Sequence, residues 1–206
     1  KPNFTEALVI RGIISLKQNN NKAALKDLET AHKSKPHLRQ IWQILISLKL
    51  QSEQFNETIL LLLTMIEIDP NYDEGISLLI ELNQKVDIPT LAIKSFERIT
   101  KIKKRDYPVF FNLGTAYQKI NDNENAIKNF RKTIEIKPDY AEAHNSMGIC
   151  LYNKGFLDDA IECYKTAIQL NPKYADALNN MGNTLVKRGD PNQAIYYYKR
   201  AIGEKP

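Results

Sequence analysis

The chain has 206 residues, of which 43% are hydrophobic and 26% are charged, and its formal net charge is a modest +5. This length allows one or two globular domains. The composition excludes a membrane span, because the most apolar segment, 59–66, is short and interrupted by Thr64. The two cysteines, Cys150 and Cys163, favour a reducing, cytoplasmic environment over a disulfide.

The sequence repeats itself every 34 residues from Thr5 onward. Self-similarity at a fixed period predicts a solenoid, a single elongated array whose units bury their apolar faces only against their neighbours. The array spans 1–206, and its six blocks are 5–38, 39–72, 73–106, 107–140, 141–174 and 175–206. Position 32 of a block is proline and position 20 is alanine in five blocks each: Pro36, Pro70, Pro138, Pro172 and Pro206, and Ala24, Ala92, Ala126, Ala160 and Ala194.

The first half of the chain contains two unusual segments. In the second block, the run Ile59–Leu63 would be apolar on every side of a helix. Such a run either meets a partner or packs beneath an irregular neighbour. Between the third and fourth blocks lies the basic cluster Lys101, Lys103, Lys104 and Arg105. A solvated turn is favoured there over a site for an acidic ligand.

The later blocks show the helical period most clearly. In the fifth block, His144, Met147, Gly148 and Leu151 follow the i, i+3, i+4, i+7 spacing of one helix face. The same spacing resumes after a break at Gly155. Two antiparallel helices per block follow, because the turn between them is short. We therefore predict an all-α structure in which recurring glycines let paired helices approach closely.

These features together resemble the tetratricopeptide repeat family. The match comprises the 34-residue period, small residues at positions 8, 20 and 27, aromatic or apolar residues at positions 4, 7, 11 and 24, and proline at position 32. The last three blocks fit best, through Gly114, Ala126, Phe130 and Pro138 and their equivalents. The resemblance implies an α-solenoid of six helix-turn-helix repeats that form a right-handed superhelix.

The first three blocks depart from the family pattern. Ile46 and Ile80 stand at position 8 where the family has a small residue, and Lys104 stands where proline is expected. We expect these changes to reshape the packing around residues 73–106 without breaking the helical period.

In the family, the first helix of each repeat lines a concave groove, and this implies a peptide-binding surface here. The polar wall of the last three blocks is rich in amides, which can pair with the main chain of an extended peptide. The candidate contacts are Phe111, Asn112, Thr115, Asn145, Ser146, Tyr152, Asn179, Asn180 and Asn183. In the first three blocks the groove is apolar, through Val9, Ile10, Ile13, Leu16, Ile44, Leu50 and Leu78. That strip either binds an amphipathic helix or apolar peptide, or is covered by upstream chain.

Asn112, Ser146 and Asn180 share position 6, where the O-linked N-acetylglucosamine transferases carry an asparagine ladder that grips substrate polypeptide. The resemblance is partial, since Ser146 interrupts the ladder. Alternatively, asparagine at this position is simply common in these repeats.

Other chemistries find little support. His32, His37 and His144 lack metal-ligand spacing, and no catalytic motif occurs, so we expect neither a cofactor nor enzymatic activity in this stretch. Acidic side chains in the groove would repel nucleic-acid phosphates. They are Glu6, Glu74, Glu81, Glu142 and Asp176.

We therefore expect a scaffold that binds a protein or peptide partner. The last helix would leave Tyr198, Ala201 and Ile202 uncovered. This predicts a longer natural chain, or self-association through the ends. A second hypothesis is that the array is the substrate-recruiting arm of a larger enzyme, such as a protein glycosyltransferase.

Overall fold

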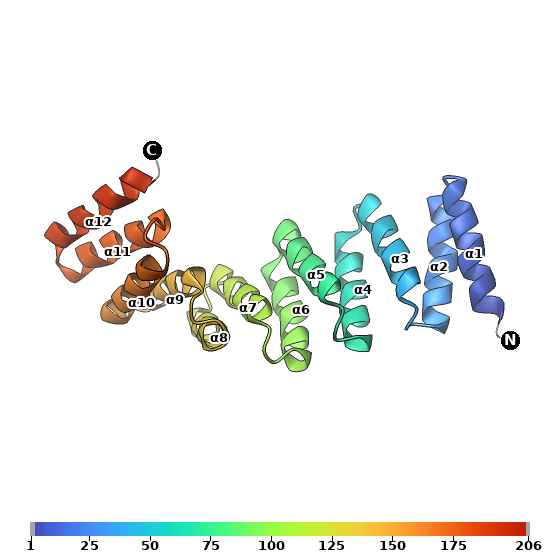
Figure 1. Ribbon diagram of the computed structural model, residues 1–206, viewed down its shortest axis with the longest axis horizontal. Helices are drawn as coiled ribbons and strands as arrows, with labels where there is room; N and C mark the ends of the chain where they lie inside the picture. Colours follow the sequence, from blue (N-terminus) through green and yellow to red (C-terminus); the bar gives the residue numbers. More distant parts are fainter. Residues whose placement is uncertain (1–2, 205–206) are drawn as a thin grey trace. The chain divides into compact units, whose positions relative to one another are not determined.

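The computed structural model describes residues 3–204 as a succession of α-helices joined by short turns, with no strand among them (Figure 1). The chain divides into two compact units, of which unit 1 ends at Ile88 and unit 2 begins at Pro89. Unit 1 holds α1 (Asn3–Lys17), α2 (Asn21–Ser34), α3 (Arg39–Gln51), α4 (Phe55–Ile68) and α5 (Asp73–Val86). Unit 2 holds α6 (Pro89–Ile102), α7 (Tyr107–Lys119), α8 (Asn123–Ile136), α9 (Ala141–Asn153), α10 (Leu157–Leu170), α11 (Ala175–Arg188) and α12 (Pro191–Glu204).

Within each unit, every helix packs against the next one along the chain. This serial packing confirms the predicted all-α helical repeat solenoid. The boundary between the units falls inside the block 73–106, where the sequence departs most from the repeat pattern. The wider prediction of one continuous array stays a prediction.

Unit 2 has two distinct faces. In addition to its sequence neighbours, α9 contacts both α7 and α11, so these three helices converge on one side. We call this side the inner face. Among the described residues, α8, α10 and α12 do not contact one another as α9 contacts α7 and α11. These three helices form the outer face.

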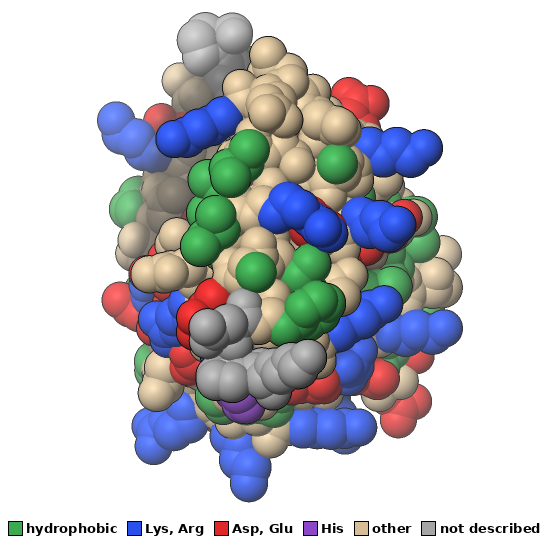
Figure 2. All heavy atoms as spheres, turned by 90° about the vertical axis from the view of Figure 1, so that its right-hand side faces the viewer, with side chains coloured by type: hydrophobic (Ala, Val, Ile, Leu, Met, Phe, Trp, Pro, Cys, Tyr) green, Lys and Arg blue, Asp and Glu red, His purple; other side chains and the backbone are tan. Residues whose placement is uncertain are grey.

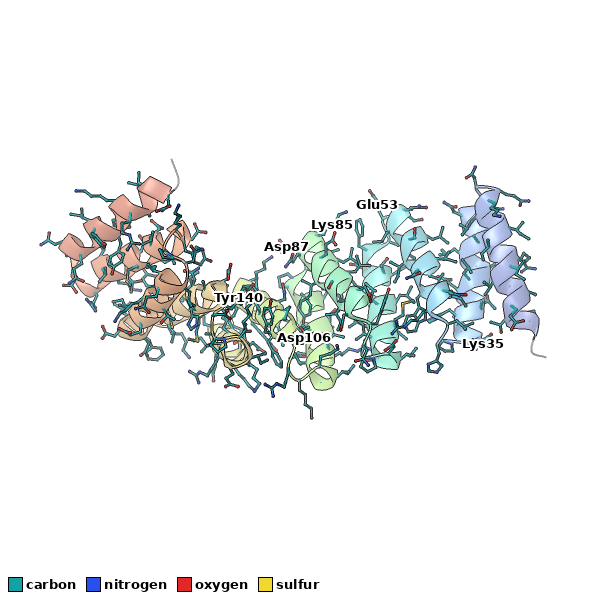
Figure 3. All side chains as sticks on the ribbon, in the orientation of Figure 1. Lys35, Glu53, Lys85, Asp87, Asp106 and Tyr140 are labelled. Atoms are coloured by element: carbon teal, nitrogen blue, oxygen red, sulfur yellow. The ribbon has the colours of Figure 1, made fainter. Side chains whose placement is uncertain are left out.

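A left-handed residue stands at position 15 of every block, between the paired helices. The six φ angles lie between 52° and 102°, at Asn19, Glu53, Asp87, Asn121, Gly155 and Gly189. This conformation reverses the chain within a turn too short for any other connection. Figure 3 labels Glu53 and Asp87, which lie at the same edge of unit 1, opposite Lys35 at the connection between α2 and α3.

The recurring glycines bring paired helices together, as predicted. A Cβ atom added at Gly148 would lie 2.6 Å from Cε1 of Tyr164, whose side chain is buried. The glycine at position 8 therefore makes room for the ring at position 24 of the same block. The same relation joins Gly114 to Phe130 and Gly182 to Tyr198.

The unusual segments have local explanations. In the apolar run of α4, only Leu60 is exposed; Ile59, Leu62 and Leu63 are buried and Leu61 is half-buried. This result favours packing within unit 1 over a partner for the run. Lys104 and Arg105 form an exposed turn before α7, as expected.

The last helix leaves apolar side chains in solvent. In α12, Ile202 is 70% exposed, while Tyr198 and Ala201 are half-buried. Self-association through this face stays a prediction.

Candidate peptide-binding surface

The predicted groove residues all lie on the three helices of the inner face. Phe111, Asn112 and Thr115 are on α7, Asn145, Ser146 and Tyr152 on α9, and Asn179, Asn180 and Asn183 on α11. The three helices that carry the nine candidates converge on one side of unit 2, and the exposure of the nine side chains differs.

A hydrogen-bonded chain of side chains connects α9 to α11. Asn180 Nδ2 donates to Asn145 Oδ1 at 3.0 Å, and Asn145 Nδ2 donates to the Tyr174 hydroxyl oxygen at 3.4 Å. Asn145 is only 5% exposed. Because its amide is already bonded on both sides, Asn145 holds Asn180 in position and offers little surface of its own to a ligand.

Tyr174 is a member of this network that the sequence analysis did not single out. Burial raises the pKa of its phenol, and Glu142 and Asp176 raise it further, against a lowering by the Asn145 hydrogen bond. The hydroxyl therefore stays protonated at neutral pH. A sequence signal for this position exists, since Tyr72, Tyr140 and Tyr174 all occupy position 34 of their blocks.

The α7 part of the inner face is mostly occupied by internal contacts. The Phe111 ring packs against the rings of Phe130 and Tyr140, with centroid distances of 5.7 and 5.0 Å. Asn112 Nδ2 donates to the backbone oxygen of Pro108 at 2.8 Å, and Thr115 Oγ1 donates to that of Phe111 at 3.0 Å. These three side chains are half-buried, so they form the base of the surface rather than its most accessible part.

The most accessible amides of the predicted site lie on α11. Asn179 and Asn183 are both exposed and stand one helical turn apart on the same side of the helix. Asn183 Oδ1 accepts a hydrogen bond of 2.8 Å from the Tyr198 hydroxyl. This contact orients the amide while its Nδ2 hydrogens stay available to a ligand.

Tyr152 on α9 carries a cation over its ring. Lys187 Nζ, from α11, lies 4.1 Å from the ring centroid. This cation–π pair connects α9 to α11. Ser146, the remaining candidate on α9, is half-buried.

Part of the predicted apolar strip of unit 1 lies at the surface. Leu16 and Ile44 line a shallow depression of about 350 Å³ together with Gln43, Ser47, Leu48 and Gln51. The end of unit 1 that α1 forms also shows hydrophobic side chains in solvent (Figure 2). The exposed ones on α1 are Phe4, Ile10, Ile13 and Ile14. Whether this strip binds an amphipathic helix or apolar peptide, or is covered by upstream chain, stays open.

Two general properties bear on the kind of site. Within residues 3–204, no three His, Cys, Asp or Glu side chains gather in a way that could hold a metal ion. None of the helices described is both long and apolar enough to span a bilayer.

Family models match the C-terminal part of the chain. Residues 114–155 and 150–189 match the family described as TPR repeat, and residues 175–206 match the tetratricopeptide repeat. Residues 114–206, just under half of the chain, are therefore similar to tetratricopeptide repeats. A comparison with curated proteins gives no match.

Solved structures extend the likeness in fold over most of the chain. A crystal structure of MamA is 24% identical in sequence and has a TM-score of 0.67. The alignment covers 76% of this chain and 92% of the MamA chain. MamA from Desulfovibrio magneticus RS-1 has a TM-score of 0.69 at 16% identity, covering 81% and 94%. YrrB, described as a TPR protein with an unusual peptide-binding site, has a TM-score of 0.68 at 20% identity, covering 87% and 92%. At these identities the likeness concerns the fold.

Proposed function

We propose that this protein is an interaction scaffold and that the inner face of unit 2 binds an extended peptide of a partner protein. The fold and its tetratricopeptide neighbours support the scaffold role. Peptide binding by YrrB, according to its description, gives a precedent for a peptide on this fold.

The observation that carries the proposal is the presence of oriented amides on α11. Asn183 is held by Tyr198, and Asn180 is held by Asn145. Exposed carboxamides offer both a donor and an acceptor to a peptide main chain, whatever its side chains. Because neighbouring contacts already fix these two groups, less conformational entropy is lost when a peptide binds.

A peptide selected from a phage-displayed library of random linear sequences, then synthesised with a fluorescent label, is the probe for this site. We expect the double variant Asn179→Ala/Asn183→Ala to raise the Kd about tenfold, because each lost hydrogen bond contributes about 0.5–1.5 kcal/mol. Asn145 is not part of the test, because its burial would mix binding with stability.

The matched control is Gln169→Ala, which removes an exposed carboxamide from α10 on the outer face. It should change the Kd by less than about twofold. If the control weakens binding as much as the α11 double variant, or if the double variant binds normally, the inner face is not the peptide site.

A further inference from the structure

A groove in unit 2 is lined mainly by α8, a helix of the outer face, and contains none of the nine residues of the proposed inner-face site. It has a volume of about 770 Å³ and is lined by α8, the end of α9 and the start of α10, with Phe110 from α7. It is larger than the depression in unit 1, and it combines an apolar floor with a charged rim.

Four hydrophobic side chains from different elements form the floor. Ile127 and Leu151 are half-buried and pack against the hydrophobic core of unit 2. Phe110 is also half-buried, whereas Phe156 is 51% exposed at the start of α10. An aromatic ring left half in solvent beside smaller apolar side chains suits the insertion of one large apolar side chain from a partner.

The rim contains more cations than anions. Lys128, Arg131, Lys132 and Lys154 line the groove together with Glu124, Glu135 and Asp159. Lys132 is neutralised by Glu135, whose oxygen lies 2.7 Å from its Nζ. No acidic side chain among the described residues forms an ion pair with Lys128 or Arg131, and both are exposed.

The stretch of sequence that contains α8 carries an excess of positive charge. Residues 89–140, which include α6 and α8, contain eleven Lys or Arg and six Asp or Glu. The exposed turn with Lys104 and Arg105 belongs to the same stretch. The resulting potential attracts negatively charged partners and raises their association rate.

We propose that this groove docks an acidic peptide segment of a partner protein. One large apolar side chain of the segment rests on the floor beside Phe156, and its carboxylates lie next to Lys128 and Arg131. A peptide fits better than a nucleic acid because the carboxylates of a peptide can be spaced so that they meet Lys128 and Arg131 and avoid Glu124 and Asp159, whereas a continuous row of phosphates would pass both acidic side chains. Together with the inner face, the groove would give one repeat array two separate binding surfaces.

The test begins with a phage-displayed library of random linear peptides, selected on the whole 206-residue protein and counter-selected on the variant Lys128→Glu/Arg131→Glu. Both side chains are exposed, so the variant should retain its helical circular dichroism. We expect the enriched sequences to carry an excess of Asp and Glu around a Leu, Phe or Trp. A library without such enrichment would overturn the proposal.

An enriched peptide, synthesised with a fluorescent label, then gives affinities by anisotropy. We expect the Kd to rise about tenfold in Lys128→Glu/Arg131→Glu at low ionic strength, and the difference to shrink at about 1 M salt. Phe156→Ala should weaken binding at both salt concentrations, since its contribution is apolar. The matched control Lys165→Glu/Lys199→Glu reverses two exposed charges elsewhere in unit 2 and should stay within about twofold.

Three results would overturn the proposal. The control could lose as much affinity as the groove variant, which would show unspecific attraction. Phe156→Ala could bind normally while single-stranded DNA competes for the site, which would indicate a nucleic-acid surface. Finally, Asn179→Ala/Asn183→Ala could abolish binding of the acidic peptide, which would assign that peptide to the inner face.

Discussion

The left-handed position between paired helices offers a test of the repeat geometry in which opposite substitutions have opposite effects. Glu53 adopts φ = 53° in unit 1, and Gly155 adopts φ = 84° at the equivalent position of the fifth block. Only glycine occupies this region without a steric cost. We expect Glu53→Gly to stabilise the protein and Gly155→Ala to destabilise it.

The magnitude follows from two opposing contributions. A residue with a Cβ atom loses about 1–2 kcal/mol in the left-handed conformation. Glycine in turn loses about 0.5–1 kcal/mol more through the entropy of the unfolded chain. The free energy of unfolding should therefore rise by about 0.5–1 kcal/mol in Glu53→Gly and fall by about the same amount in Gly155→Ala. No atom lies within 4 Å of a Cβ built at Gly155, so the backbone alone determines the cost there.

The assay is urea unfolding, monitored both by tryptophan fluorescence and by circular dichroism. Trp42 is the single tryptophan of the chain, and its side chain is 1% exposed in unit 1, where its ring lies 5.5 Å from that of Tyr72. Its fluorescence therefore reports on unit 1, while circular dichroism reports on all helices. Glu53→Gly should move the fluorescence midpoint to higher urea, and Gly155→Ala should lower the midpoint of the dichroism transition.

Glu53→Ala is the matched control, because it removes the carboxylate but keeps the Cβ atom. It should not raise the midpoint. Equal stabilisation by Glu53→Ala and Glu53→Gly would mean that charge, not backbone conformation, limits stability at this position. An unchanged midpoint in Gly155→Ala would likewise refute the reasoning.

Two more predictions concern packing in unit 2. Gly148→Ala should lower the free energy of unfolding by about 1–3 kcal/mol, because its Cβ would lie 2.6 Å from the buried Tyr164 ring; Gly203→Ala, with no atom nearby, is the control for chemical denaturation. Burial raises the pKa of Cys150 and Cys163 to about 11 each. Since the unfolded thiols ionise near pH 9.0, raising the pH from 7 to 9 should cost about 0.4 kcal/mol for each thiol. Urea midpoints at the two pH values test this, and an unchanged midpoint would contradict it.

The sequence predicts the helices and their pairing well because the signals are local and repeated. The i, i+4 spacing that joins His144 to Gly148 needs only the chain itself, and the same holds for the break at Gly155. The close contact of position 8 with position 24 was not itself predicted, although it too is internal to a block. Repetition multiplies each of these signals, and the structure confirms them in every block that carries them.

The candidate site is predicted less completely. Its nine residues lie on α7, α9 and α11, and their role in peptide binding stays a prediction. Their exposure depends in part on neighbouring blocks: Asn145 is covered by Tyr174, the last residue of its own block, and by Asn180 from the next repeat. No spacing within the block of Asn145 shows the contact with Asn180.

By itself, the sequence determined that this chain forms paired helices in a 34-residue period, because helix periodicity and turn geometry are properties of short segments. Only the tertiary structure decided which amides on α11 stay accessible and that a basic groove opens beside Phe156 along α8. The physical reason is that burial and cavities result from contacts between helices of different repeats, whereas each repeat fixes only its own fold.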